Sequence, residues 1–166
     1  MGSSNAAHRL EDSGDDDVYR GEVHGAKEEY GRAIDAYLEM GDAEGGIRTC
    51  RKLIRLAPDV VRTRYTLLCL LSAQRRAAEA ERTLHEYLDA VRQTGTSSYA
   101  VPRLVLLGAV VDDPQLRESI GAALLQLGAE TDGSNLIAHA KAAAAGLWPG
   151  PDPRVRREQI FRLARL

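Results

Sequence analysis

Apolar residues recur at every third or fourth position along most of the chain, which is the spacing of one face of an α-helix. The pattern is clearest at 26–40, where Tyr30, Ala33, Ile34, Tyr37 and Leu38 share one side. It predicts helices at 26–40, 43–57, 60–72, 78–93, 98–111, 114–127, 135–147 and 154–166. No stretch keeps the alternation of a strand, so we expect an all-α fold.

Turn and capping residues separate these helices. Gly41 suits a left-handed C-cap, and Asp42 suits the N-cap of the helix that follows. Asp113 and Pro114 suit the N-cap and the first helical position of a later helix, and we expect Pro102 within a first turn. Because the connections are short, neighbouring helices are expected to be antiparallel.

Residues 1–24 are polar, acidic and interrupted by glycine, so we expect an arm that is disordered or partly helical. Its aspartates at 15–17 are expected to cap a short helix that begins near Val18. The aspartates lack the spacing of a calcium-binding loop. Near the other end, a polar turn is expected at 130–134.

The stretch 61–92 repeats the pattern of 25–58 with a period of 34 residues, which is typical of stacked helix pairs. This pattern resembles the tetratricopeptide repeat family. The first repeat carries the matching small, bulky and terminal residues Tyr30, Ala33, Tyr37, Gly46, Cys50, Leu53 and Pro58, and the second carries Leu67, Leu68, Leu71, Ala80, Leu84 and Tyr87. Ile34, Arg64 and Arg92 depart from the family pattern.

The resemblance implies an α-solenoid of antiparallel helix hairpins. We expect about three helix pairs over 25–129, followed by C-terminal capping helices over 130–166. Such stacks curve, and the first helix of each pair lines the concave side.

The resemblance also implies which residues face that groove. They are Glu28, Gly31, Asp35, Leu38 and Glu39 in the first repeat and Arg62, Tyr65, Cys69, Ser72 and Ala73 in the second. The groove is expected to be acidic at one end and mixed at the other. It lacks the lysine and asparagine set with which some family members hold a C-terminal carboxylate. A protein or peptide partner with basic and apolar groups suits it better.

Charge is distributed unevenly along the 166 residues. Residues 1–46 hold 12 acidic and 4 basic groups, whereas residues 47–166 hold 12 acidic and 18 basic groups. Two solvated faces of opposite sign explain this, and homo-oligomerisation stays open. No apolar run is long enough to span a bilayer and no signal sequence is present, so we expect a cytoplasmic protein. The 19 arginines against 3 lysines suggest a GC-rich bacterial genome.

The residues that carry chemistry are sparse. Cys50 and Cys69 fall on predicted helices among apolar neighbours, so we expect buried thiols rather than a disulfide. The histidines His8, His24, His85 and His139 are scattered without ligand spacing. We find no metal site, cofactor motif or paired nucleophile and base, so we do not expect an enzyme.

Three further features have ordinary structural explanations. The stripe formed by Arg48, Arg51, Lys52 and Arg55 is interpreted as a solvated helix face, with nucleic acid disfavoured and an acidic protein partner left open. Trp148 is expected to seal the end of the core, or else to anchor a partner. The basic helix at 154–166 is expected to dock on the preceding helix rather than on a membrane surface.

The sequence therefore predicts a non-enzymatic adaptor that holds a partner peptide or helix in its groove. The alternative is a regulatory or self-association module of a larger bacterial signalling or transcriptional assembly. Both hypotheses rest on architecture rather than on a reactive site.

Overall fold

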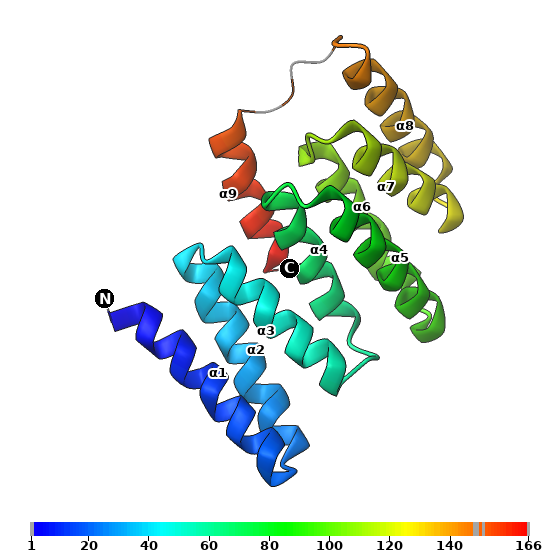
Figure 1. Cartoon of the computed structure of the whole chain (residues 1–166). Helices are drawn as coiled ribbons and strands as arrows, with labels where there is room; N and C mark the ends of the chain where they lie inside the picture. The colour runs from blue at the N-terminus through cyan, green and yellow to red at the C-terminus, as the bar shows by residue number, and fades with distance from the viewer. Residues whose placement is uncertain (1, 148–149, 151, 166) are drawn as a thin grey trace.

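The computed structural model describes residues 2–147, 150 and 152–165, with side chains from residue 5 onward, and these residues form nine α-helices and no strand (Figure 1). The helices are α1 (Gly2–Arg20), α2 (Val23–Met40), α3 (Ala43–Leu56), α4 (Val61–Ala73), α5 (Ala77–Thr94), α6 (Ser97–Val110), α7 (Pro114–Gln126), α8 (Glu130–Ala144) and α9 (Pro153–Ala164). The all-α prediction is confirmed.

The capping residues act as the sequence predicted. Asp42 accepts a hydrogen bond from the Gly45 amide, and Asp113 accepts one from the Leu116 amide. Gly41 ends α2 with a φ of 69° in the left-handed region, where a side chain would be strained. From α1 to α8, connections of two to four residues turn each helix back along its neighbour.

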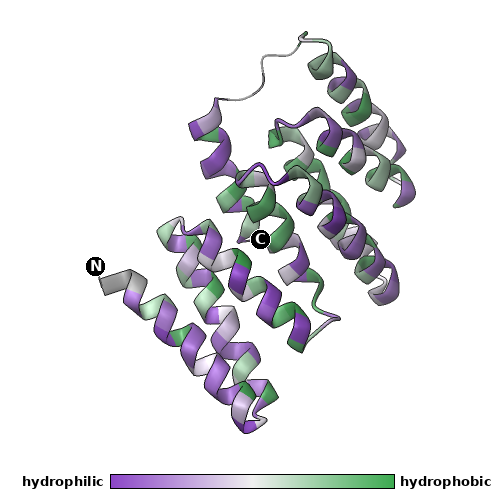
Figure 2. Cartoon of the chain, in the orientation of Figure 1, coloured by the Kyte–Doolittle hydropathy of each residue, from purple (hydrophilic) through white to green (hydrophobic). Residues whose placement is uncertain are grey.

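The main core runs through the stack, with α4 at its centre. Thr63 and every residue from 65 to 73 are buried, because α3, α5 and α9 all pack on α4. The composition of the helices fits this position, because α4 and α6 are more hydrophobic than α1 (Figure 2). Ile160, Phe161 and Ala164 of α9 enter the same core.

The expectation of a disordered N-terminal arm is wrong for residues 2–20. They form α1, which packs along α2 and covers a second small core made of Ala7, Ala33 and Tyr37. Gly14 allows the close approach, since a Cβ there would lie 2.7 Å from the Tyr30 ring. Glu11 is also buried in this contact. The glycine and the acidic residue that suggested disorder are thus part of the packing.

Two other boundaries differ from the prediction. The helix α8 begins at Glu130 and includes the expected turn, because Gly133 packs directly against Gly121 of α7. The helix α6 begins at Ser97, which places Pro102 in its second turn rather than its first. The Ser98 carbonyl therefore lacks its usual main-chain donor, because proline has no N–H.

The last helix does not cap the end of the stack. Helix α8 packs on α7, whereas α9 returns to pack on α4 and α6, and Figure 1 shows it beside α4. The prediction that the helix at 154–166 docks on the preceding helix is therefore wrong. Trp148 lies outside the described residues. None of the helices in the described part of the chain combines the length and apolar content needed to cross a membrane.

Candidate functional site

Helices α2, α4 and α6 are the first members of the three expected pairs, and we call the surface they offer the first-helix face. Helix α9 lies on it. The Thr66 hydroxyl of α4 donates to the Ala164 carbonyl at 2.8 Å, and the Arg62 guanidinium donates to the Arg165 carbonyl at 3.3 Å. The last turn of α9 is thereby fixed near the start of α4.

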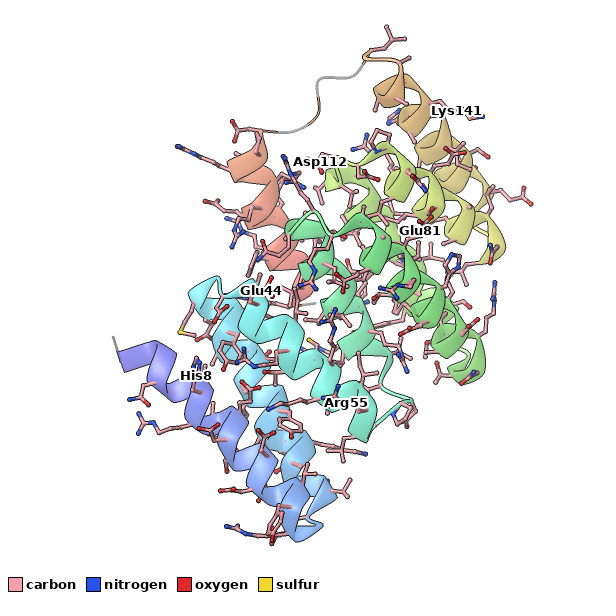
Figure 3. The ribbon with its side chains drawn as sticks, in the orientation of Figure 1. His8, Glu44, Arg55, Glu81, Asp112 and Lys141 are labelled. Atoms are coloured by element: carbon pink, nitrogen blue, oxygen red, sulfur yellow. The ribbon has the colours of Figure 1, made fainter. Side chains whose placement is uncertain are left out.

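The first turn of α9 is held by an ion-pair network. The buried Arg156 donates to Asp112 at 2.9 Å, and the other oxygen of this carboxylate pairs with Arg75 at 3.2 Å. Asp112 follows α6 and Arg75 follows α4, and Figure 3 shows Asp112 beside the start of α9. Helix α9 therefore runs antiparallel to both α4 and α6.

The local sequence explains why 153–164 is a helix with one apolar side. Asp152 accepts hydrogen bonds from the amides of Arg154 and Val155, and Pro153 occupies the first helical position. Ile160, Phe161 and Ala164 follow at the spacing of one helical face and are all buried. The exposed arginines lie outside this buried face, whereas the buried Arg156 belongs to it.

The structure divides the predicted groove residues into two sets. Glu28, Asp35, Glu39 and Arg62 are exposed. Leu38, Tyr65, Cys69 and Ser72 are buried, with Tyr65 only 1% exposed. The Tyr65 hydroxyl donates to the Arg103 carbonyl of α6 at 3.0 Å. The expectation that Tyr65 and Cys69 face an open groove is therefore wrong, because helix packing covers them, whereas the buried Leu38 still borders a cleft.

What remains open on this face lies between α2 and α9. A cleft of about 600 Å³ separates residues 38–41, at the end of α2, from α9, and we call it the α2–α9 cleft. Its α9 wall is formed by Arg154, Arg157, Glu158, Phe161, Arg162 and Arg165. A smaller cleft of about 190 Å³ lies further along α2 and includes Asp35, Arg62 and Ala164. Asp35 and Glu39 thus border α9 rather than an empty groove, whereas Glu28 pairs with His24.

A second polar cluster, which the sequence analysis missed, joins α1 to α3. The Glu11 carboxylate accepts from Arg48 at 2.6 and 2.9 Å and from the Tyr37 hydroxyl at 2.7 Å, and it pairs with Lys52 at 2.9 Å. Lys52 also contacts Asp15 at 2.6 Å. The sequence contained a signal for this cluster. Glu11 and Asp15 are four residues apart on one helix, and their partners Arg48 and Lys52 are four residues apart on another.

This cluster changes the titration of its members. Burial alone would raise the pKa of Glu11, but the hydrogen bonds from Arg48, Lys52 and Tyr37 outweigh it and lower the pKa to about 2. Burial and the Glu11 carboxylate together raise the pKa of Tyr37. Glu11 therefore stays ionised near neutral pH, and its role is to attach α1 to the stack.

The remaining candidate groups show no reactive arrangement. Cys50 and Cys69 are free and buried, as predicted, and burial raises the pKa of the Cys69 thiol to about 12. A thiol with such a pKa is a poor nucleophile near neutral pH. Among the described residues, no group of three or more histidines, cysteines and acidic residues is placed to hold a metal ion.

Comparison with models of known protein families, with curated proteins and with solved structures finds no match for this chain. The tetratricopeptide resemblance therefore stays a prediction. Inference about function starts from the contacts and charges of the first-helix face.

Proposed function

We propose that this chain is a non-enzymatic protein-interaction scaffold whose first-helix face binds an amphipathic helix with basic and apolar residues. The observation that carries the proposal is the docking of α9, which is a helix of this kind. The binding mode is helix-in-groove recognition, in which a few apolar side chains anchor one face of a helix. In this chain the site is occupied by α9 of the same molecule, so a partner helix would compete with α9.

The contacts of α9 define what such a partner must offer. Ile160 and Ala164 are 0% and 1% exposed, so the anchors are apolar residues four positions apart. Arg156 adds a cation that reaches Asp112 beyond the end of α6. Exposed acidic residues of α2, at Asp35 and Glu39, lie beside the docked helix and favour a basic ligand.

Competition between α9 and a partner makes the scaffold regulated. A tethered helix has an effective concentration of about 1 mM or more for a nearby site, so α9 outcompetes a weak free ligand. A partner must therefore bind tightly, or α9 must be released first.

The direct test uses a fluorescent peptide with the sequence of residues 153–165 and the full-length chain. Replacing the buried Ile160 by aspartate places a charge in the core, so α9 should leave its site without altering α4 or α6. The peptide should then bind the Ile160→Asp variant at least about tenfold more tightly than the unmodified chain, measured by fluorescence anisotropy.

Gln159→Asp is the matched control, because Gln159 is the exposed neighbour on the same helix. This variant should bind the peptide as weakly as the unmodified chain does. Equal peptide affinity in the two variants would show that the first-helix face is not a helix-binding site.

A self-association module is the second candidate, and one observation favours it. Helix α9 docks on α4, which precedes it by some 90 positions, and on α6, and eight residues join it to α8. The same contacts are satisfied when two copies exchange their α9 helices. Light scattering over a range of protein concentrations distinguishes a monomeric scaffold from a self-association module, because helix exchange gives a dimer that the Ile160→Asp variant cannot form.

A further inference from the structure

The side of α9 that faces the end of α2 is lined with arginines. Arg154, Arg157, Arg162 and Arg165 are exposed, and all four line the α2–α9 cleft. At about 100° per residue, the residues three, eight and eleven positions beyond Arg154 fall within an arc of about 140° around the helix, so the four arginines lie on one broad side. The buried Phe161 lies within the same arc.

These arginines differ from many others in the protein in having no carboxylate partner. Arg48 and Arg76, for example, each form ion pairs with glutamates. Among the described residues, no carboxylate forms an ion pair with Arg154, Arg162 or Arg165. Three arginines that line one cleft therefore have guanidinium groups that no carboxylate of the described residues engages.

The cleft also has an apolar side. Phe161 is 8% exposed and lines it together with Leu38 and the half-buried Met40. Arg157 lies 5.1 Å from the centre of the Phe161 ring and donates to the Gly41 carbonyl at 3.1 Å, which ties the two walls together. The cleft is thus a fixed feature of the docked state of α9.

We propose that the α2–α9 cleft binds an acidic peptide segment of a protein partner. Its carboxylates pair with Arg154, Arg162 and Arg165, since a guanidinium presents a planar pair of donors that matches a carboxylate. An apolar side chain of the peptide packs on Phe161 and Met40.

The charges of the cleft favour a peptide over a long polyanion. Glu158 lies on the α9 wall with the arginines, Glu39 lies on the opposite α2 wall, and Asp35 lies one turn before Glu39 on α2. A nucleic acid or an anionic membrane, with closely spaced charges over a long surface, would meet these carboxylates. A short peptide that places two or three carboxylates among apolar residues avoids them.

This site goes beyond the helix-binding function and is independent of it. The acidic peptide needs α9 docked, because α9 supplies the arginine wall, whereas a partner helix needs α9 displaced. Failure of one experiment therefore leaves the other standing.

The test measures binding of a fluorescent synthetic peptide, about 12 residues long with aspartates and leucines alternating, to the full-length chain. The double variant Arg154→Gln/Arg162→Gln should weaken binding by about tenfold or more, because two charge-assisted contacts are lost. The affinity of the unmodified chain should fall as salt rises from about 50 to about 200 mM. The same peptide with asparagine in place of aspartate should not bind.

Arg82→Gln is the matched control, because Arg82 is exposed, lies on α5 away from the cleft and forms none of the ion pairs among the described residues. It should leave peptide affinity unchanged. The arginines of the double variant are solvent-exposed, so its thermal unfolding should match that of the unmodified chain. The charge-reversed Arg154→Glu/Arg162→Glu chain should bind a lysine version of the peptide, which a merely unfolded variant would not do.

Unchanged affinity in the double variant, or equal binding of the asparagine peptide, would overturn the proposal. Tighter binding of a DNA duplex or of anionic lipid vesicles than of the acidic peptide would also overturn it, since the ligand class would then be wrong. Ile160→Asp should abolish binding of the acidic peptide, because the arginine wall leaves with α9.

Discussion

At the scale of single residues, Glu11 shows how a buried charge decides where a helix lies. Its side chain is 5% exposed, and Arg48, Lys52 and Tyr37 surround its carboxylate. A buried carboxylate without partners would cost several kcal/mol, so α1 is stable in this position only because α2 and α3 supply them. The acidity of the N-terminal segment is therefore compatible with order.

Replacing Glu11 by glutamine should reduce the free energy of unfolding by about 1–3 kcal/mol, because the cations lose their charged partner. The pKa of Glu11 is lowered from 4.5 to about 2 in the folded protein. Its contribution is therefore complete above about pH 4.5 and is lost as the pH falls towards 2. Urea unfolding measured between pH 7 and pH 3 tests both expectations.

The exposed neighbour Asp12 supplies the control, and Asp12→Asn should unfold like the unmodified chain at pH 7. The loss of stability between pH 4.5 and pH 3 should be smaller in Glu11→Gln than in Asp12→Asn. Parallel acid curves for the two variants would contradict the role assigned to Glu11.

At the level of helices, a glycine can either end a helix or allow a close contact between two helices, and sequence spacing does not distinguish these roles. Gly41, as predicted, and Gly95 end helices in the left-handed conformation. Gly14 falls in the expected N-terminal arm and Gly133 in the expected turn, yet both lie inside helices at contacts with a neighbour. Only the packing partner distinguishes a helix end from a close helix contact.

Gly121→Ala tests the contact between α7 and α8. A Cβ at this position would lie 2.7 Å from Ile137 and 3.0 Å from the Gly133 carbonyl, so the helices must separate. We expect a loss of about 1–3 kcal/mol in the free energy of unfolding, measured in urea. Gly31→Ala has open space and should instead stabilise α2 by about 0.5–1 kcal/mol. Equal effects of the two substitutions would refute the close contact.

At the scale of the whole molecule, α9 decides which surfaces are available. It covers part of the first-helix face, buries its own apolar side and creates the α2–α9 cleft. Its attachment depends on contacts with residues at 62, 66 and 112 rather than on neighbours in the sequence. An element attached in this way is expected to open independently of the stack.

Asp112→Asn should loosen α9 selectively, because it leaves the buried Arg156 without its charged partner. Amide hydrogen exchange of 153–164, followed by mass spectrometry, should become about tenfold faster or more, with the exchange of α2 and α3 unchanged. Asp59→Asn, at an exposed position between α3 and α4, should change neither. Unchanged exchange of α9 in the Asp112→Asn variant would show that the ion pair does not hold it.

Apolar periodicity and capping are local properties of the chain, so the sequence alone predicts the helices from α2 to α7 to within three residues at each end. It also identified the exposed acidic residues of α2, such as Asp35 and Glu39. The tertiary structure alone decided that α1 is ordered, that Tyr65 and Cys69 are covered and that α9 lies on α4. These outcomes depend on long-range partners, such as Glu11 with Arg48 and Arg156 with Asp112, whose pairing no local pattern specifies.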